Sequence, residues 1–264
     1  MSSYPQIEFY DIACTVTSEP WSPYTARTFL SLRLLDIPFE RQKLPMAKID
    51  ATLLAAGVEH PAGADRHLLP AITVSPSSTG GAKEWILGSD EIAAYLQKLY
   101  LEHGGELSKS LFPDAASKEL VEKVRGCFKS SLYAEDRWQN IIPFIYMILD
   151  PESQEYFHRT RTEQWGKSPK EVIATDAKKN EERDGGNDKL YALAMQPFGE
   201  LYDNKDRKEG VWLGGERAIY ADLMVIALLQ WYKYAKGDAF ESGLKQVGGG
   251  LEKAWNAGQA LLKN

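Results

Sequence analysis

Apolar and polar residues recur with two different periods in the first hundred residues of the chain. Residues 23–35 and 90–101 place apolar side chains at helical spacing, which predicts two helices. Short apolar runs bounded by proline, glycine and aspartate predict strands at residues 7–10, 39–44, 69–74 and 84–87. A proline, serine and glycine turn at residues 75–81 makes the last two strands a hairpin, and residues 45–66 are expected to be irregular. This order of elements predicts a mixed sheet covered by helices.

The rest of the chain has a helical pattern almost throughout. Residues 102–106 have the composition of a linker, so we expect one domain over residues 1–104 and a second, all-helical domain over residues 105–264. Residues 221–236 are apolar nearly all round, which predicts the central helix of the second domain. The other expected helical segments are 118–149 with a bend at Pro143, 151–165, 169–184, 189–202 and 244–262.

Composition limits the classes of protein to consider. The chain has 264 residues and a net charge of -6 with no strongly basic region, so nucleic acid is not an expected partner. The N-terminus lacks the basic head and apolar core of a signal peptide. The longest apolar run, residues 223–229, is far shorter than the roughly 20 residues that cross a bilayer. We therefore expect a cytoplasmic protein with no membrane partner.

Cysteine and histidine give no support for a disulfide framework or a metal site. Cys14 and Cys127 are too few for a disulfide scaffold or a zinc site. The four histidines show no metal-ligand spacing with acidic neighbours; they are His60, His67, His103 and His158. We therefore predict no bound metal.

The candidate site is Ser22, which directly precedes Pro23 at the start of the first predicted helix. Proline fits the first helical turn because its missing N–H would have no partner there, so Ser22 falls at or beside the N-cap. The hydroxyl, free backbone N–H groups and the positive end of the helix dipole then converge on one point, which suits an anion such as a thiolate. An ordinary N-cap has the same pattern, so these residues alone leave both interpretations open.

Several motifs in a fixed order resemble the glutathione transferase family. The Ser-Pro helix start is followed by Leu69-Pro70 before a strand and by the sequence GSDEIAAYL at residues 88–96. The fungal etherase-related class of that family is similar in Trp21-Ser22-Pro23, in SQEYFHRTR at residues 153–161, and in WLGG at 212–215 followed by YAD at 220–222. The resemblance covers essentially the whole chain. It implies a thioredoxin-like domain followed by an all-helical domain, assembled as a homodimer.

The resemblance also implies how glutathione would bind. Leu69 would pair through its backbone with the cysteinyl part of glutathione, beside a cis peptide bond at Pro70. Ser89 and the backbone beside Gly88 would hold the γ-glutamyl carboxylate. The sequence departs from the family at Gly88, where an acidic residue is usual, so one contact to the glutathione amine is absent or comes from elsewhere. It departs again at Ile219, which replaces a helix-capping Ser or Thr, so something else must hold that turn.

The expected activity is transfer of glutathione to hydrophobic or aromatic electrophiles, by conjugation or by etherase-like cleavage. Free thiols ionise near pH 8.5, and a hydrogen bond from Ser22 together with the helix end supplies the roughly 2.7 kcal/mol that lowering the thiol pKa by two units requires. Trp21 and Tyr24 flank this position and are candidates to contact the electrophile. The resemblance assigns the rest of the pocket to the second domain, where Tyr133 and Trp138 are candidates and core packing is the alternative.

Two other functions remain open. In a ligandin-type carrier, the same pocket holds flat aromatic compounds without turning them over. In a thiol oxidoreductase of glutaredoxin type, a cysteine does the chemistry. The oxidoreductase is disfavoured because residue 22 is serine and no Cys-x-x-Cys occurs, and Cys14, just past the first strand, is the rival thiol.

Overall fold

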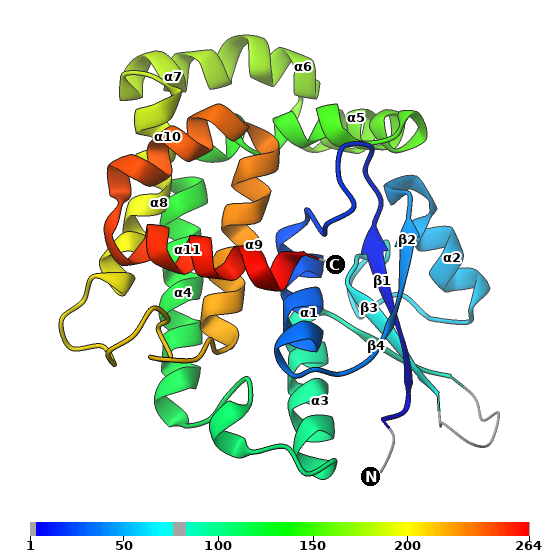
Figure 1. The fold of residues 1–264 in the computed structure, drawn as a ribbon. Helices are drawn as coiled ribbons and strands as arrows, with labels where there is room; N and C mark the ends of the chain where they lie inside the picture. Colours follow the sequence, from blue (N-terminus) through cyan, green and yellow to red (C-terminus); the bar gives the residue numbers. More distant parts are fainter. Residues whose placement is uncertain (1–3, 76–82, 264) are drawn as a thin grey trace.

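The computed structural model describes residues 4–75 and 83–263, and its two halves differ in architecture (Figure 1). The first half contains a sheet with strand order β2-β1-β3-β4. β1 (Gln6–Ile12) pairs in parallel with β2 (Glu40–Leu44) and antiparallel with β3 (Ala71–Ser75), and β3 pairs antiparallel with β4 (Glu84–Leu87). The predicted mixed sheet and the pairing of its last two strands are therefore confirmed. The turn predicted at 75–81 lies, beyond its first residue, outside the described residues.

Side chains of β1 alternate between the two faces of the sheet and so enter two different cores. Ile7 and Phe9 are buried in the large core that includes α1 (Pro23–Leu34) and α3 (Ser89–Glu102). Tyr10, on the other face, packs against a smaller cluster that includes residues of α2 (Ile49–Ala55). The prediction that this region is irregular is wrong. A helix with only two buried apolar residues, Ile49 and Leu53, is too short to show a helical period in the sequence.

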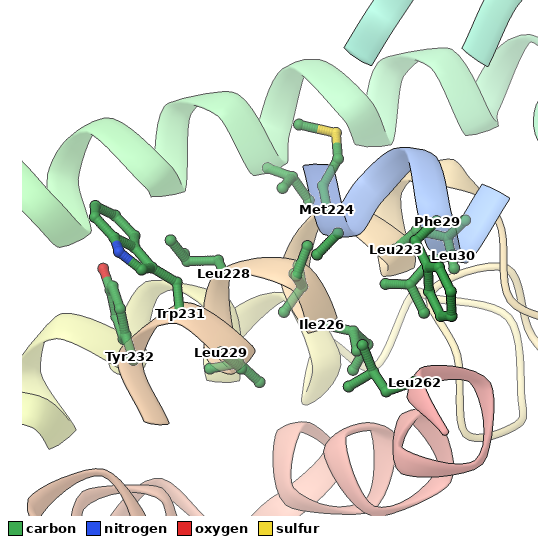
Figure 2. Packing of buried hydrophobic residues seen from close by; sticks show 14 of the residues in the cluster. Phe29, Leu30, Leu223, Met224, Ile226, Leu228, Leu229, Trp231, Tyr232 and Leu262 are labelled. Atoms are coloured by element: carbon green, nitrogen blue, oxygen red, sulfur yellow. The ribbon is translucent and has the colours of Figure 1, made fainter. Parts of the chain in front are cut away.

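The second half is helical, and α9 (Tyr220–Ala235) runs through its centre. α9 is buried along almost its whole length and packs against α1 as well as its helical neighbours. Figure 2 shows its side chains beside Phe29 and Leu30 of α1 and Leu262 of α11. The predicted central helix is confirmed, and it joins the two halves. The other helices of this half are α4 (Ala115–Tyr133), α5 (Pro151–Trp165), α6 (Pro169–Val172), α7 (Lys178–Asp184), α8 (Asn187–Tyr202), α10 (Gly237–Val247) and α11 (Gly249–Leu262).

Three predicted helical segments are divided in the structure. The segment 118–149 is not one bent helix: α4 ends at Tyr133, and the 3-10 turns Ala134–Asn140 and Pro143–Ile148 follow. Glu135 and Asp136 have φ values of 52° and 56°, a left-handed backbone that cannot continue an α-helix. The segment 169–184 contains a π-helical turn between α6 and α7, and the segment 244–262 is interrupted by two left-handed glycines. No helix within the described ranges is both long and apolar enough to cross a membrane.

Candidate active site

Ser22 is the N-cap residue of α1, and Pro23 occupies the first helical position as predicted. The Ser22 backbone is extended (φ -71°, ψ 135°), and its carbonyl oxygen accepts the first helical hydrogen bond from the Ala26 N–H at 2.9 Å. The Ser22 hydroxyl, in contrast, makes no capping hydrogen bond to the helix. The residue is 5% exposed. A buried hydroxyl beside the free N–H groups of a helix start is therefore left for another acceptor.

The loop between β1 and α1 is tied to both halves of the protein. Trp21 is 3% exposed, and its Nε1 donates to the Ile12 carbonyl oxygen at 3.1 Å. Thr15 donates from its backbone N–H and its hydroxyl to the Ile148 carbonyl oxygen, at 2.9 and 3.1 Å. These contacts hold Ser22 in place. Trp21 is thus packed into this loop beside Ser22, and its contact with an electrophile stays a prediction.

The Leu69–Pro70 peptide bond is cis, as the resemblance implies. Both residues are buried at the start of β3. The Pro70 carbonyl oxygen accepts a hydrogen bond from the Gly88 N–H at 3.1 Å. This bond joins the beginning of β3 to the beginning of α3, so the two segments expected to bind glutathione lie side by side.

The N-terminus of α3 is fixed by residues from the helical half. Gly88 is the N-cap residue with φ 92°, and Ser89 begins the helix with 7% exposure. The Tyr220 hydroxyl of α9 lies 3.1 Å from the Ser89 carbonyl oxygen and 2.8 Å from Asp90 Oδ1, so these two acceptors share its single proton. Arg125 of α4 donates to Asp90 Oδ2 at 2.7 Å. Because α9 and α4 fix its direction, α3 presents its free N–H groups at a defined position.

Glu91 occupies the space that a side chain at position 88 would fill. Its carboxylate lies over Gly88, with its Cδ 3.1 Å from the point where a Cβ on that residue would stand. The Gly88 N–H is already bonded to Pro70, so Glu91 does not serve as its cap. A carboxylate is therefore present beside Ser89 although residue 88 has none. The sequence motif alone did not reveal this.

The other aromatic candidates lie in different surroundings. Tyr24 is 45% exposed and stacks on the Arg27 guanidinium, 4.9 Å from the ring centre. Tyr133 is 57% exposed at the end of α4. Trp138 is half-buried and packs on Trp165 of α5, with 5.0 Å between ring centres. Tyr24 and Tyr133 thus retain more surface for a ligand than Trp138, which packs against the helical core and is partly exposed.

The turn before α9 is held by the carboxylate of Asp222. Its Oδ2 accepts the Ile219 N–H at 3.0 Å, and its Oδ1 accepts the Leu213 N–H and the Tyr202 hydroxyl, each at 2.7 Å. Burial raises the pKa of Asp222 to about 6, against these hydrogen bonds, which lower it. Asp222 therefore holds the turn in which Ile219 supplies no capping hydroxyl.

Two of the histidines come together with an acidic residue. Asp50, His60 and His67 each offer one potential ligand atom, and these atoms lie within 4.8 Å of one another. The prediction that the histidines have no metal-ligand arrangement with acidic neighbours rested on sequence spacing. The fold brings Asp50, His60 and His67 together although they are up to 17 residues apart in the sequence.

Cys14 lies in the loop after β1, where its thiol donates to the Thr17 carbonyl oxygen at 3.5 Å.

A small mixed sheet with a cis-proline, joined to an all-helical half, defines the glutathione transferase fold. Comparison with known families agrees, since the family described as "Glutathione S-transferase, C-terminal domain" matches residues 125–257. The chain belongs to the glutathione transferase family.

Individual relatives are distant but match along nearly the whole chain. The glutathione S-transferase-like protein ustS of Aspergillus flavus is 25% identical over 266 residues, which cover 97% of this chain and 91% of that protein. The crystal structure of glutathione transferase GSTFuA3 from Phanerochaete chrysosporium covers 99% of both chains with a TM-score of 0.73 and 21% identity. A glutathione S-transferase of Ceriporiopsis subvermispora, solved in complex with glutathione, covers 98% of both chains with a TM-score of 0.70 and 22% identity. At these identities the structural matches establish the fold.

Proposed function

We propose that this protein is a serine-type glutathione transferase. Residues 1–104 would bind glutathione, and residues 105–264 would contribute the pocket for a hydrophobic or aromatic electrophile. The observation that carries the proposal is the Ser22 hydroxyl, which is buried at the start of α1 and makes no hydrogen bond to its own helix. Glutathione bound in the Ceriporiopsis structure, which has the same fold, supports the choice of thiol.

In this mechanism Ser22 stabilises the glutathione thiolate by donating a hydrogen bond to sulfur. The thiol proton leaves to solvent, and the helix N-terminus adds favourable electrostatic energy to the anion. The thiolate then attacks an electrophilic carbon. A carbon–sulfur bond forms, the bond to a halide or phenolate leaving group breaks, and the leaving group departs with the electron pair. Ser22 takes no proton during this sequence.

The γ-glutamyl end of glutathione carries a carboxylate and an ammonium group on one carbon. The Ser89 hydroxyl and the N–H groups at the start of α3 suit the carboxylate. The ammonium group needs an anion close by, and Glu91 is the carboxylate that lies over Gly88. We therefore assign Glu91 the role that an acidic residue at position 88 plays in other members of the family. Weak pairing with glutathione at Gly88 would favour a carrier, so this assignment favours an enzyme.

The resemblance to the fungal etherase-related class supports a proposal for the location, oligomeric state and substrates of the protein. We propose a cytoplasmic homodimer that acts on aromatic or other hydrophobic electrophiles, by conjugation or by ether cleavage. Tyr24 and Tyr133 are the candidates with exposed ring surface for such a substrate.

Turnover assays distinguish the enzyme from the carrier. We expect the purified protein to conjugate glutathione with chlorodinitrobenzene, or to release a phenol from a β-aryl ether, at a rate that falls in Ser22→Ala. Cys14→Ser is the control and should retain the rate, because the Cys14 thiol bonds to its own loop. A protein that binds an aromatic dye tightly but turns over neither substrate would be a carrier. A rate that depends on Cys14 would indicate the oxidoreductase.

A further inference from the structure

Three polar side chains converge where α2 begins and where the loop after α2 returns to the sheet. The convergence point is Asp50 Oδ1, which lies 2.9 Å from His60 Nε2 and 2.9 Å from His67 Nδ1. The same oxygen accepts the His67 backbone N–H at 2.8 Å. The His67 side chain is completely buried, whereas the Asp50 and His60 side chains are 36% and 32% exposed. The cluster therefore has a fixed inner wall and an open outer face.

The hydrogen bonds of His67 determine which of its nitrogens carries a proton. His67 Nε2 lies 3.0 Å from the Glu59 carbonyl oxygen, which can only accept, so Nε2 is the N–H donor. In a neutral ring, Nδ1 then has only a lone pair to direct at Asp50. Asp50 Oδ1 also accepts the His67 backbone N–H at 2.8 Å, a contact that suits the carboxylate anion. A lone pair facing a carboxylate is stabilised only when a positive charge lies between them.

We propose that this charge is a divalent transition-metal cation bound by His67 Nδ1, His60 Nε2 and Asp50 Oδ1. Imidazole and carboxylate are ligands that Zn²⁺, Co²⁺ and Ni²⁺ accept. The Glu59 carbonyl supplies the outer hydrogen bond that metal-bound histidines generally make. A second proton on His67 is the alternative source of the charge.

The distances suit an octahedral ion with open positions. Two donors that are each about 2.1 Å from a metal and about 2.9 Å from each other subtend an angle of about 90°. Both imidazole nitrogens lie 2.9 Å from Asp50 Oδ1, so each pair meets this condition. All three donor atoms lie within 4.8 Å of one another, and the partly exposed His60 ring has room to adjust its position. Water molecules would complete the coordination on the exposed side.

A bound cation would join α2 to the residues that lead into the cis-proline. His67 lies three residues before Pro70, and His60 lies in the same loop. The unfolded chain does not hold the three ligands together, so the metal binds the native state preferentially and stabilises it.

Metal titration of the untagged, chelator-treated full chain tests the site. We expect one equivalent of Zn²⁺ to bind and to raise the thermal unfolding temperature. Co²⁺ should give the spectrum of nitrogen and oxygen ligands without a thiolate charge-transfer band. His60→Ala should weaken binding by about tenfold or more, because it removes a ligand directly. His158→Ala is the matched control, since His158 is exposed on α5 outside the cluster, and should bind as the parent does.

Several outcomes would overturn the proposal. No saturable binding to the parent protein would mean that the charge between His67 and Asp50 is a proton. Equal affinity in His60→Ala and the parent would place the ion elsewhere. A thiolate band with Co²⁺ would assign the ion to Cys14 or Cys127. Because His60 makes its hydrogen bond from an exposed position, His60→Ala should remain folded, and its unfolding temperature without metal checks this.

Discussion

Ser22→Ala removes a hydroxyl that α1 does not use. A serine that caps its helix typically contributes about 1 kcal/mol to stability, but the Ser22 hydroxyl makes no such bond. We therefore expect the free energy of unfolding to change by less than about 1 kcal/mol. The Ala26 N–H keeps its bond to the carbonyl of residue 22, and Pro23 keeps the helix start in place. A loss of activity in this variant would consequently come from the site and not from unfolding.

The expected change in thiol ionisation follows from the contacts that remain. A hydrogen bond to a charged group contributes about 1.5–3 kcal/mol, which corresponds to about 1–2 pKa units. The helix N-terminus remains in Ser22→Ala and contributes about 0.3–2 kcal/mol. The pKa of bound glutathione should therefore lie well below that of the free thiol in the parent and rise by about 1–2 units in the variant. Turnover near neutral pH should fall by about tenfold to a hundredfold.

The sign of the effect gives a pH test. Ser22 favours the anion, so its removal reduces the thiolate fraction only at pH values below the raised pKa. Above about pH 9 both complexes are ionised, and the difference in rate due to ionisation should largely disappear. Thiolate absorbance in the ultraviolet reports the midpoint directly. Ser31→Ala is the matched control, because it removes a buried hydroxyl that donates to the Arg27 carbonyl oxygen two turns further along α1.

Two results would refute the reasoning. If the parent complex titrates at the midpoint of free glutathione, neither the helix start nor Ser22 stabilises a thiolate. If Ser22→Ala titrates at the parent midpoint, the hydroxyl is not the donor to sulfur, although the site itself can still bind glutathione.

Three further variants test the surroundings of the site. Ser89→Ala should raise the KM for glutathione by about tenfold with little change in kcat, because Ser89 would contact glutathione equally in the bound complex and in the transition state. A fall in kcat alone would contradict this role. Glu91→Gln should weaken the binding of glutathione severalfold but leave unchanged the binding of an analogue without the α-amino group, as measured in competition assays. Equal losses of affinity for both ligands would show that Glu91 does not contact the ammonium group. Asp222→Ala should lower the free energy of unfolding by about 3–5 kcal/mol in urea titrations, since buried donors from Ile219, Leu213 and Tyr202 lose their acceptor; a loss below about 1 kcal/mol would show that water replaces it.

Local patterns predicted those parts of the fold that local chemistry determines. The alternation at Ile7 and Phe9 marks the strand face that α1 and α3 cover, and the unbroken apolar surface of α9 marks a helix buried on all sides. Ser22-Pro23 located the start of α1 correctly because proline restricts the backbone by itself. In each case a few neighbouring residues contain all the information needed.

The end of α4 could not be predicted in that way, because distant residues hold it. Glu135 and Asp136 adopt left-handed backbone, and their carbonyl oxygens accept hydrogen bonds from Arg183 and Asn180 of α7 at 2.9 and 3.1 Å. The donors lie more than forty residues further along the chain. A helical pattern continues through this break, so the sequence predicted a bend at Pro143 instead. The same break fixes where Tyr133 and Trp138 lie.

At the candidate site, comparing sequence positions one by one also missed a side chain that the fold brings close. At position 88 the motif lacks its acidic residue, which by sequence alone weakens the case for glutathione. In space a carboxylate is nevertheless present there, because one helical turn returns Glu91 to the point above Gly88. His60 and His67 are a second example. Neither histidine belongs to a sequence motif, yet both lie 2.9 Å from Asp50 Oδ1. The proposed contact with glutathione depends on where the Glu91 carboxylate lies, so we expect a substitution at Glu91 to test it more directly than a substitution at residue 88.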